Sequence, residues 1–422
     1  MKLSIVFVGI GALALAAGCE NRSTAGPVQP VPDPVPDPVP VVNLGDPMSG
    51  LTADELAAFE RGREVFLRRF TPSTGLGPLY NASSCMSCHS EPAPGGGSDL
   101  YRNFYVATYG FSPFSFNLPG LISPVVPSFG TILSQQFTLT GGRSTIPTNI
   151  GVLPVQSDQR NSIPMFGVGL FERISDQTIL ANADPDDADA DGISGRANND
   201  GVGLGRFGTK AQANNIEIFT RAPLFNQMGV TTNALLGEGA AVSMGHGAFV
   251  QGSATPNAPT TDNDGVPDPE MSPSDLGDLI AFSRFLAPPQ PMAFSESAVR
   301  GQTVFADVGC VKCHIPSLES STGPVTAYTD LLIHDMGPEL AGEVSFGSPQ
   351  SSALASSTTE SEWRTQPLWG VSRVGPYLHD GRASTLDDAI RMHGGEAESI
   401  REAYVDLSAD QRADLLEFLR HL

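Results

Sequence analysis

The sequence of 422 residues is poor in cysteine, in basic residues and in long apolar runs. Only 24 Lys and Arg stand against 46 Asp and Glu, which gives a formal net charge of −22. A chain this acidic lacks the basic face with which proteins bind nucleic acids, so we expect no nucleic-acid partner. With 17% charged residues, 45 Gly and 35 Pro, the composition also excludes a coiled coil and favours a loop-rich globular protein.

The N-terminal residues are typical of an exported bacterial lipoprotein. Residues 1–18 have a basic start, an apolar stretch too short to span a membrane, and small residues before Cys19, so they predict a lipoprotein signal peptide. Leu15 lies one place early for a lipid-attachment signal, and ordinary secretory cleavage beside an incidental cysteine is the alternative. Residues 19–50 form a Pro-rich linker that favours an extended spacer. We therefore expect an extracytoplasmic protein that a lipid on Cys19 anchors to the membrane.

The other four cysteines form two C-x-x-C-H motifs. Two thiols at this spacing can bond to both vinyl groups of one haem, and the adjacent histidine then binds the iron. A redox dithiol would not need the histidines, and a Cys₄ zinc site would leave both of them unexplained. The motifs therefore predict two covalently bound haem c groups, held by Cys85, Cys88, His89, Cys310, Cys313 and His314.

Similar segments precede the two motifs. Residues 52–70 and 295–305 each carry apolar residues at helical spacing around a glycine, as in a helix that leads into a haem loop. This weak internal duplication predicts a mainly α fold with two cytochrome c-like haem domains, over residues 51–290 and 291–422. The N-terminal domain would contain a long loop-rich insertion, near residues 110–290, with short helices and a small hairpin.

Longer segments carry a family resemblance. Residues 363–397 contain R-T-Q-P-L and P-Y-L-H-D-G-R-A-S-T-L-D-D-A, and further matching words occur at 160–170, 189–198 and 205–211. From about residue 51 onward, the chain resembles the bacterial dihaem cytochrome c peroxidase and MauG superfamily, within it the thiol oxidoreductase-like dihaem oxidoreductases. The resemblance implies that the C-terminal haem passes electrons, whereas the N-terminal haem reacts with peroxide or another oxidant.

The resemblance also implies a distal ligand for the C-terminal haem. Its position, four residues after Ala389, is occupied by His393, while Met392 falls one place short. We therefore expect a bis-His haem, the alternative being a surface histidine on a helix. His379 is expected near the haem edge, and the pair His334 and Met336 has no support from the family pattern.

The N-terminal haem has no distal histidine soon after its motif. The word S-M-G-H-G places Met244 and His246 far downstream, and either is an alternative ligand. We expect an open distal face with Glu172 as the acid/base. The alternative is that Glu172 forms an ion pair with Arg173 or faces solvent. Trp369 is either an electron relay between the haems or a packing residue.

An acidic loop at residues 184–194 resembles the first half of an EF-hand. Asp187, Asp189 and Asp191 are its candidate calcium ligands, but Asn198 occupies the place where a glutamate is expected. A related fragment lies at residues 260–268. The alternative for both is a solvated acidic turn.

Together these features predict a peroxidase-like dihaem oxidoreductase. Its acidic surface would attract a basic electron-donor cytochrome or another small redox protein, and a small oxidant such as peroxide would be its substrate. A dihaem cytochrome that only transfers electrons is one alternative. Oxidation of an organic substrate, as in MauG-like enzymes or related dioxygenases, is another, and fold likeness does not separate them.

Overall fold

The computed structural model divides the chain into two compact units, and the residues that it describes belong to the second, Val41–Leu422. Backbone and side chains are described over residues 43–99, 158–199, 203–233, 261, 264–342 and 358–422, side chains 79 and 226 excepted. The backbone alone is described for 104–109, 130–134, 137–138, 149–150 and 153–157. The signal peptide, Cys19, Met244 and His246 lie outside the described residues.

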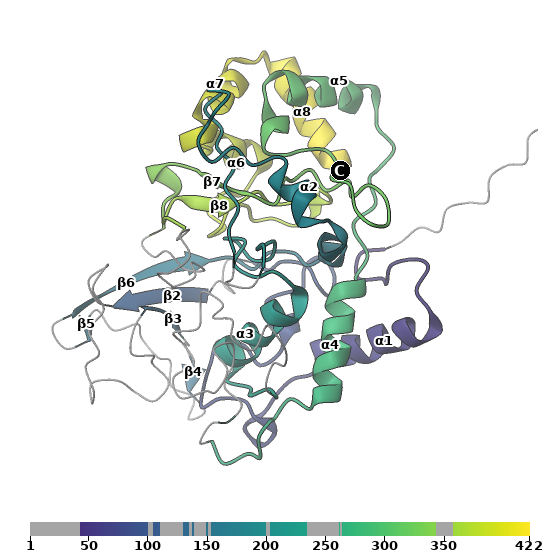
Figure 1. The fold of residues 1–422 in the computed structure, drawn as a ribbon, viewed down its shortest axis with the longest axis vertical. Coiled ribbons are helices and arrows are strands. Elements are labelled where there is room, and N and C mark those ends of the chain that lie inside the picture. The colour runs from purple at the N-terminus through teal and green to yellow at the C-terminus, as the bar shows by residue number, and fades with distance from the viewer. Residues whose placement is uncertain are drawn as a thin grey trace, which may run out of the picture. The chain divides into compact units, whose positions relative to one another are not determined.

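A close helix pair precedes and follows the first motif in sequence. Helix α1 (Ala53–Leu67) begins with a capping box at Thr52 and packs against α4 (Pro273–Phe285) (Figure 1). At Gly62 the two backbones approach so closely that a Cβ atom would lie 1.9 Å from the carbonyl oxygen of Asp278. Only glycine fits at this crossing. Arg61 also pairs with the Asp278 carboxylate at 2.8 Å.

The second helix pair repeats this arrangement. Helix α5 (Glu296–Asp307) packs against α8 (Ala409–His421), and a Cβ atom on Gly301 would lie 1.9 Å from the carbonyl oxygen of Asp414. Arg300 pairs with the Asp414 carboxylate at 2.8 Å. In both halves, therefore, a glycine lies at the helix crossing, and the arginine before it pairs with an aspartate of the partner helix. The internal duplication would require this repetition. The predicted domain boundaries themselves stay predictions.

Each helix pair places an aromatic residue beside a motif histidine. Phe66 of α1 contacts Phe282 of α4 at 4.7 Å between ring centroids and lies 6.4 Å from His89. In the second pair, Phe305 contacts Phe418 at 5.3 Å and lies 6.4 Å from His314. The motifs themselves form short 3-10 turns, η2 (Cys85–Ser87) and η7 (Cys310–Lys312).

The segment between the motifs contains more sheet than the small hairpin expected. Strands β2 (Phe104–Tyr109), β3 (Gly130–Ser134), β5 (Asn149–Ile150) and β6 (Leu153–Arg160) form an antiparallel sheet of order β3-β2-β6-β5. Strands β1 (Leu79–Tyr80) and β4 (Phe137–Thr138) form a separate pair. The β6 sequence L-P-V-Q-S-D-Q-R has no regular apolar alternation, so the sequence gives little sign of this strand.

Short helices complete this segment, as expected. They are the 3-10 helix η4 (Val168–Arg173), α2 (Asp176–Leu180) and α3 (Ile216–Met228). Backbone hydrogen bonds between Arg196 and Ile333, both 2.9 Å, join the segment to the C-terminal half. Ile333 opens strand β7 (Ile333–Asp335), which pairs with β8 (Glu362–Arg364).

The rest of the C-terminal half is helical. Helices α6 (Leu386–Arg391) and α7 (Glu398–Asp406) precede α8, and the 3-10 turns here are η8 (Pro338–Leu340), η9 (Val371–Arg373) and η10 (Gly395–Ala397). One further 3-10 turn, η1 (Pro72–Thr74), follows α1 in the N-terminal half. Over the described residues helix exceeds strand, in agreement with the mainly α prediction. Within the same residues, no helix combines the length and apolar character needed to cross a membrane.

Candidate functional site

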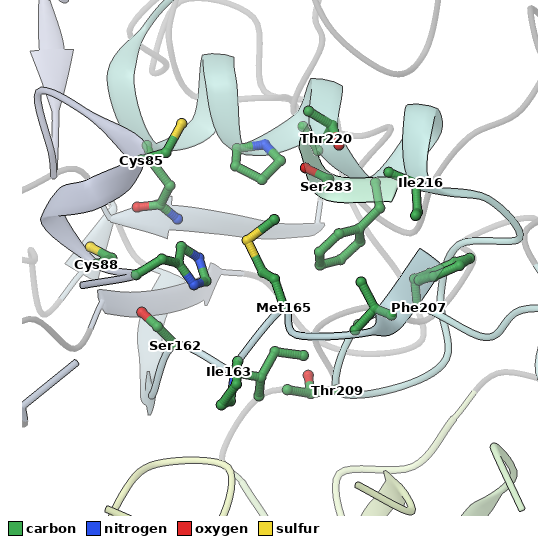
Figure 2. Close-up of a pocket in the computed structure, with 18 of the residues that line it drawn as sticks. Cys85, Cys88, Ser162, Ile163, Met165, Phe207, Thr209, Ile216, Thr220 and Ser283 are labelled. Atoms are coloured by element: carbon green, nitrogen blue, oxygen red, sulfur yellow. The ribbon is translucent and has the colours of Figure 1, made fainter. Parts of the chain in front are cut away.

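The first motif lies in the wall of a cavity. Cys85, Cys88 and His89 line it together with mostly apolar side chains, among them Met165, Phe171 and Phe207 (Figure 2). The empty space, together with the open solvent at its mouth, is about 1500 Å³. A porphyrin needs an apolar slot with sulfur atoms and an imidazole at its wall, so the residues present fit a haem group.

His89 is prepared to act as an iron ligand. Its Nδ1 atom lies 3.0 Å from the carbonyl oxygen of Gly96, to which Nδ1–H donates. That hydrogen bond leaves the lone pair on Nε2, the atom that binds a metal in such an arrangement. Burial lowers the pKa of His89, so the ring stays neutral and keeps this lone pair available.

The second motif has the same preparation. Nδ1–H of His314 donates to the carbonyl oxygen of Tyr328 at 3.0 Å. Burial, aided by the nearby His393 and His334, lowers the pKa of His314 to about 4. His393 is thus near enough to His314 to affect its titration.

His393 follows the C-terminal end of α6. Its Nδ1–H donates to the carbonyl oxygen of Ala389 at 2.7 Å, which again leaves Nε2 as the ligand atom. Burial lowers the pKa of His393 as well. The Met392 side chain, by contrast, is 37% exposed. This geometry favours His393 over Met392 as the distal ligand, and the assignment stays a prediction.

Glu172 lies next to residues of the cavity wall. Its carboxylate accepts hydrogen bonds from Nε of Arg284 at 2.6 Å and from the backbone N–H of Ile216 at 2.9 Å. Glu172 thus forms an ion pair, but its partner is Arg284 and not the Arg173 considered from the sequence. Glu172 is not itself among the residues that line the cavity, although its carboxylate contacts the backbone of Ile216, which is. A role for Glu172 in proton transfer stays a prediction.

His334 is surrounded by acids. Its Nε2 lies 2.8 Å from Asp330 and its Nδ1 lies 2.8 Å from Glu396. Although burial opposes protonation, hydrogen bonds to Asp330, Cys313 and Glu396 hold the pKa of His334 well above its ordinary value. An imidazolium has no lone pair to offer a metal, so the geometry opposes His334 as an iron ligand.

His379 is buried against an aromatic residue. Its ring stacks on Trp363 with centroids 3.9 Å apart and an interplanar angle of 7°. Burial, aided by the charge of Arg160, lowers the pKa of His379 to about 3. Trp369 stacks on Phe171 of the cavity wall at 5.4 Å, which accounts for it as a packing residue.

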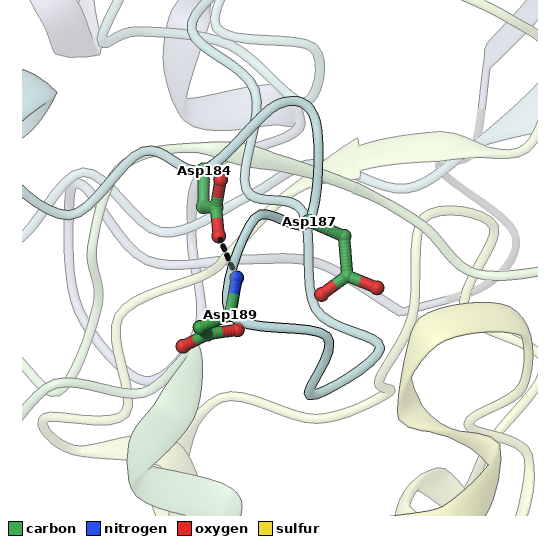
Figure 3. A group of neighbouring side chains, drawn as sticks. All are labelled: Asp184, Asp187 and Asp189. Atoms are coloured by element: carbon green, nitrogen blue, oxygen red, sulfur yellow. Dashed lines mark hydrogen bonds between the residues drawn. The ribbon is translucent and has the colours of Figure 1, made fainter.

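The acidic loop brings together a slightly different set of carboxylates. Oxygen atoms of Asp184, Asp187 and Asp189 lie within 4.8 Å of one another (Figure 3). Asp191, predicted as a ligand, instead pairs with Lys312 at 2.9 Å, and Asp184 takes its place in the group. The buried Asn198 donates to the carbonyl oxygen of Lys210 and is not part of it. Three carboxylates at this spacing could hold a calcium ion.

Sequence reasoning missed the charged residues of the cavity. Arg160, Arg206 and Arg364 line it, and all three are buried. Each lies within a segment that carries the family resemblance, at the first residue of R-N-S-I-P or within G-R-F-G and R-T-Q-P-L. A buried arginine cannot be recognised from sequence, because arginines are ordinarily exposed.

Curated relatives match part of the chain. A methylamine utilization protein MauG from Methylophilus methylotrophus is 30% identical over 155 residues, covering 35% of this chain and 42% of MauG. The hydrazine synthase subunit gamma of Kuenenia stuttgartiensis is 28% identical over 187 residues, covering 36% and 50%. The chain thus spans half or less of the length of these relatives.

Solved structures give weaker likenesses. The diheme peroxidase BthA of Burkholderia thailandensis, as its Y463M variant, has 15% identity and a TM-score of 0.38, covering 86% of this chain and 85% of BthA. A MauG-like protein associated with microbial copper homeostasis has 20% identity and a TM-score of 0.24, covering 35% and 52%.

A family model decides the assignment. The model described as "Di-haem oxidoreductase, putative peroxidase" matches residues 143–422, about two thirds of the chain. The family implies haem cofactors, and both the resemblance and the oxidoreductase class predicted from the sequence are confirmed. The chain belongs to the di-haem oxidoreductase family.

Proposed function

We propose that the protein is an extracytoplasmic, lipid-anchored dihaem c-type oxidoreductase with peroxidase-like chemistry. The two C-x-x-C-H motifs would bind the haems through thioether bonds. His314 and His393 would hold the C-terminal haem, which would supply electron transfer, and His89 would hold the N-terminal haem, which would supply the reaction with the oxidant. The cavity at the first motif is the observation that carries this proposal, because peroxide must reach an iron whose second face is open.

The surroundings of the two motifs differ as one electron-transferring haem and one reactive haem would require. At the second motif an imidazole suited to be a second ligand lies near His314. At the first motif, the described cavity lining holds no histidine other than His89. A haem bound there supplies iron redox chemistry, while the apolar wall excludes bulk water and His89 holds the metal from one side.

An electron-transfer cytochrome is the second candidate. Met165 and Met228 also line the cavity, and a thioether is a common second ligand of haem iron. With either methionine bound, the N-terminal haem would be six-coordinate and inert to peroxide. Oxidation of an organic or protein substrate, as the likeness to MauG suggests, would use the same open iron.

Anchoring and partners follow from the sequence. A lipid on Cys19 would hold the protein at a bacterial membrane surface, and the Pro-rich linker would keep the folded unit away from the lipid. The net charge of −22 favours a basic electron donor, whose association rate would fall as salt is added. A calcium ion at the acidic loop would be structural.

Expression in a host that matures c-type cytochromes tests the proposal. The mature protein should gain the mass of two haems and show a high-spin ferric signal, as isolated or half-reduced, that changes rapidly with peroxide. A Cys85→Ser/Cys88→Ser variant should lose that signal and peroxide turnover but keep the low-spin spectrum. Low-spin spectra in every redox state, inert to peroxide, would favour the electron-transfer cytochrome.

Membrane attachment needs its own test. The full-length protein should fractionate with membranes, and a Cys19→Ser variant should be found in the soluble fraction. Equal distribution of both proteins would contradict the lipid anchor.

A further inference from the structure

Arg364 brings an uncompensated charge to the cavity. It is the last residue of β8, in the second half of the chain, yet its side chain lines the cavity of the first motif. Its Nε donates to the carbonyl oxygen of Gly208 at 2.8 Å and its Nη2 to Oε1 of Gln366 at 2.9 Å. The Nη1 atom is buried without a hydrogen-bond partner among the described residues.

The charge on Arg364 persists despite its burial. The side chain is only 4% exposed, and burial lowers its pKa to about 10. The guanidinium therefore stays protonated at neutral pH. A buried cation without a partner costs several kcal/mol, so such groups are normally paired with an anion.

Neighbouring acids are already paired with other groups. Asp158 pairs with Arg160 at 2.6 Å, and Asp176 pairs with Arg206. Asp330, the one acid that acts electrostatically on Arg364, is hydrogen-bonded to His334. Within the described part of the chain, Arg364 forms no ion pair.

Lys210 is a second buried basic residue near β8. It is fully buried, and its Nζ donates to the backbone carbonyl of Thr359 at 2.7 Å and lies 3.7 Å from the Trp363 ring centroid. Burial, and then the charge of Arg160, lowers the pKa of Lys210 to about 7, so its amine is only partly charged near neutral pH. Lys210 does not line the cavity, so the buried charge at the wall is that of Arg364, which has no anion to pair with among the described protein groups.

The position of Arg364 indicates which anion this is. Its side chain and backbone N–H are hydrogen-bonded to Gly208 and Thr209, respectively. Figure 2 shows Thr209 and Phe207 on the side of the cavity away from Cys85 and Cys88. In haem c, the two vinyl-derived thioethers lie on one edge of the porphyrin and the two propionates lie on the opposite edge. A haem attached at the cysteines would therefore direct its propionates toward this wall.

We propose that Arg364 binds a carboxylate in this cavity, namely a propionate of the haem held by the first motif. This inference rests on the proposed covalent haem. The two charge-assisted hydrogen bonds that a guanidinium offers a carboxylate would satisfy Nη1 and neutralise the buried charge. A carboxylate of a small substrate has the same chemistry and is the other source of the anion. The contact would tie the N-terminal haem to β8, whose Trp363 stacks on His379.

The test compares Arg364→Gln and Arg364→Lys with the wild type, all matured with haem. Mass spectrometry first establishes that two haems are attached in each protein. The midpoint potential of the N-terminal haem is then measured by spectroelectrochemical titration without added carboxylate. A nearby cation favours the reduced, more negative haem, so Arg364→Gln should lower the potential, and Arg364→Lys should shift it less. Arg61→Gln, which removes a surface arginine paired with Asp278, is the control and should leave the potential unchanged.

Benzoate distinguishes the two sources of carboxylate. If Arg364→Gln leaves the potential unchanged but weakens benzoate binding at least tenfold, measured by the haem absorbance, the arginine binds a substrate carboxylate and the propionate assignment is wrong. If neither quantity changes in a folded, dihaem Arg364→Gln protein, the carboxylate site is wrong altogether. A wild-type protein without attached haem would contradict the proposed function itself, and its mass alone reveals that outcome.

Discussion

Lys312, between the two cysteines of the second motif, forms an ion pair of 2.9 Å with Asp191 of the acidic loop. A second connection lies nearby, because the backbone N–H of Ser194 donates to the Glu396 carboxylate at 3.0 Å. Glu396 in turn holds His334, whose Nδ1 lies 3.6 Å from Sγ of Cys313. The acidic loop therefore contacts the structure around the second motif from two sides.

Calcium should stabilise the protein through the acidic loop. Because Asp184, Asp187 and Asp189 converge, Ca²⁺ should raise the temperature of unfolding and EDTA should lower it. At a hundredfold excess of Ca²⁺ over the dissociation constant, the gain would be about 2.7 kcal/mol. Asp189→Asn should remove most of this effect in differential scanning calorimetry.

Asp186→Asn is the matched control, since Asp186 is an exposed residue of the same loop outside the cluster. It should keep the response to Ca²⁺. Identical melting curves with Ca²⁺ and with EDTA would show that the loop is a solvated acidic turn.

Replacing His393 should change the spin state of one haem. With the second ligand removed in His393→Ala, the C-terminal haem should become high spin, visible in absorption and electron paramagnetic resonance spectra. Met392→Ala, one residue earlier and exposed, should leave the low-spin spectrum intact. A low-spin His393→Ala protein that retains both haems would reject the ligand assignment.

The acid–imidazolium group around His334 should make stability depend on pH. The pKa of His334 is raised in the folded protein. Its contribution to the free energy of unfolding is therefore fully present below about pH 6.5 and is lost as the pH rises through the pKa of the folded state. Burial acts to raise the pKa of Glu396, but hydrogen bonds from His334 and Ser194 lower it to about 2. Its contribution is present above about pH 4.5 and is lost as the pH falls toward 2.

His334→Gln tests this contribution. It should lower the free energy of unfolding near pH 5.5 by about 3–5 kcal/mol, because it leaves the buried Asp330 carboxylate without its counter-charge. The loss should shrink at high pH, where the wild-type imidazole is neutral as well. His421→Gln, at the end of α8, should have a much smaller effect, and equal losses at every pH would contradict the pH dependence.

The two glycine crossings should be intolerant of a methyl group. Gly62→Ala and Gly301→Ala would each place a Cβ atom 1.9 Å from a carbonyl oxygen, so the helices must separate. We expect a loss of about 1–3 kcal/mol or more in the free energy of unfolding, measured by denaturant titration. Gly277→Ala in α4 is the control, because no atom lies within 4 Å of its Cβ position. It should be neutral or stabilising by up to about 1 kcal/mol.

Variants of Glu172 and Arg284 separate a structural role from a catalytic one. If the ion pair positions η4 against α4, Glu172→Gln and Arg284→Gln should both lower stability and leave peroxide turnover within a fewfold of the wild type. A loss of turnover of a hundredfold or more in Glu172→Gln alone, with stability retained, would instead support general acid/base catalysis.

The family and the first-order chemistry could be predicted from local sequence. A C-x-x-C-H motif brings its thiols and imidazole together within five residues, whatever the rest of the fold, and the spacing to His393 runs along one short helix. The R-T-Q-P-L and P-Y-L-H-D-G segments then gave the di-haem family, which the match over residues 143–422 confirmed. The antiparallel sheet was not foreseen, because its strands pair over long separations and lack alternation.

Contacts between segments far apart in the sequence determined the ion pairs, the carboxylate cluster and the lining of the cavity. Sequence alone established that the chain is acidic, rich in Gly and Pro and contains two C-x-x-C-H motifs, since each property depends on composition or on neighbours in the chain. Only the tertiary structure paired Glu172 with Arg284, replaced Asp191 by Asp184 in the carboxylate cluster, and brought Arg364 to the wall of a cavity formed around Cys85. Whether an ionisable side chain is buried, and which charge it meets there, depends on which remote segments pack around it.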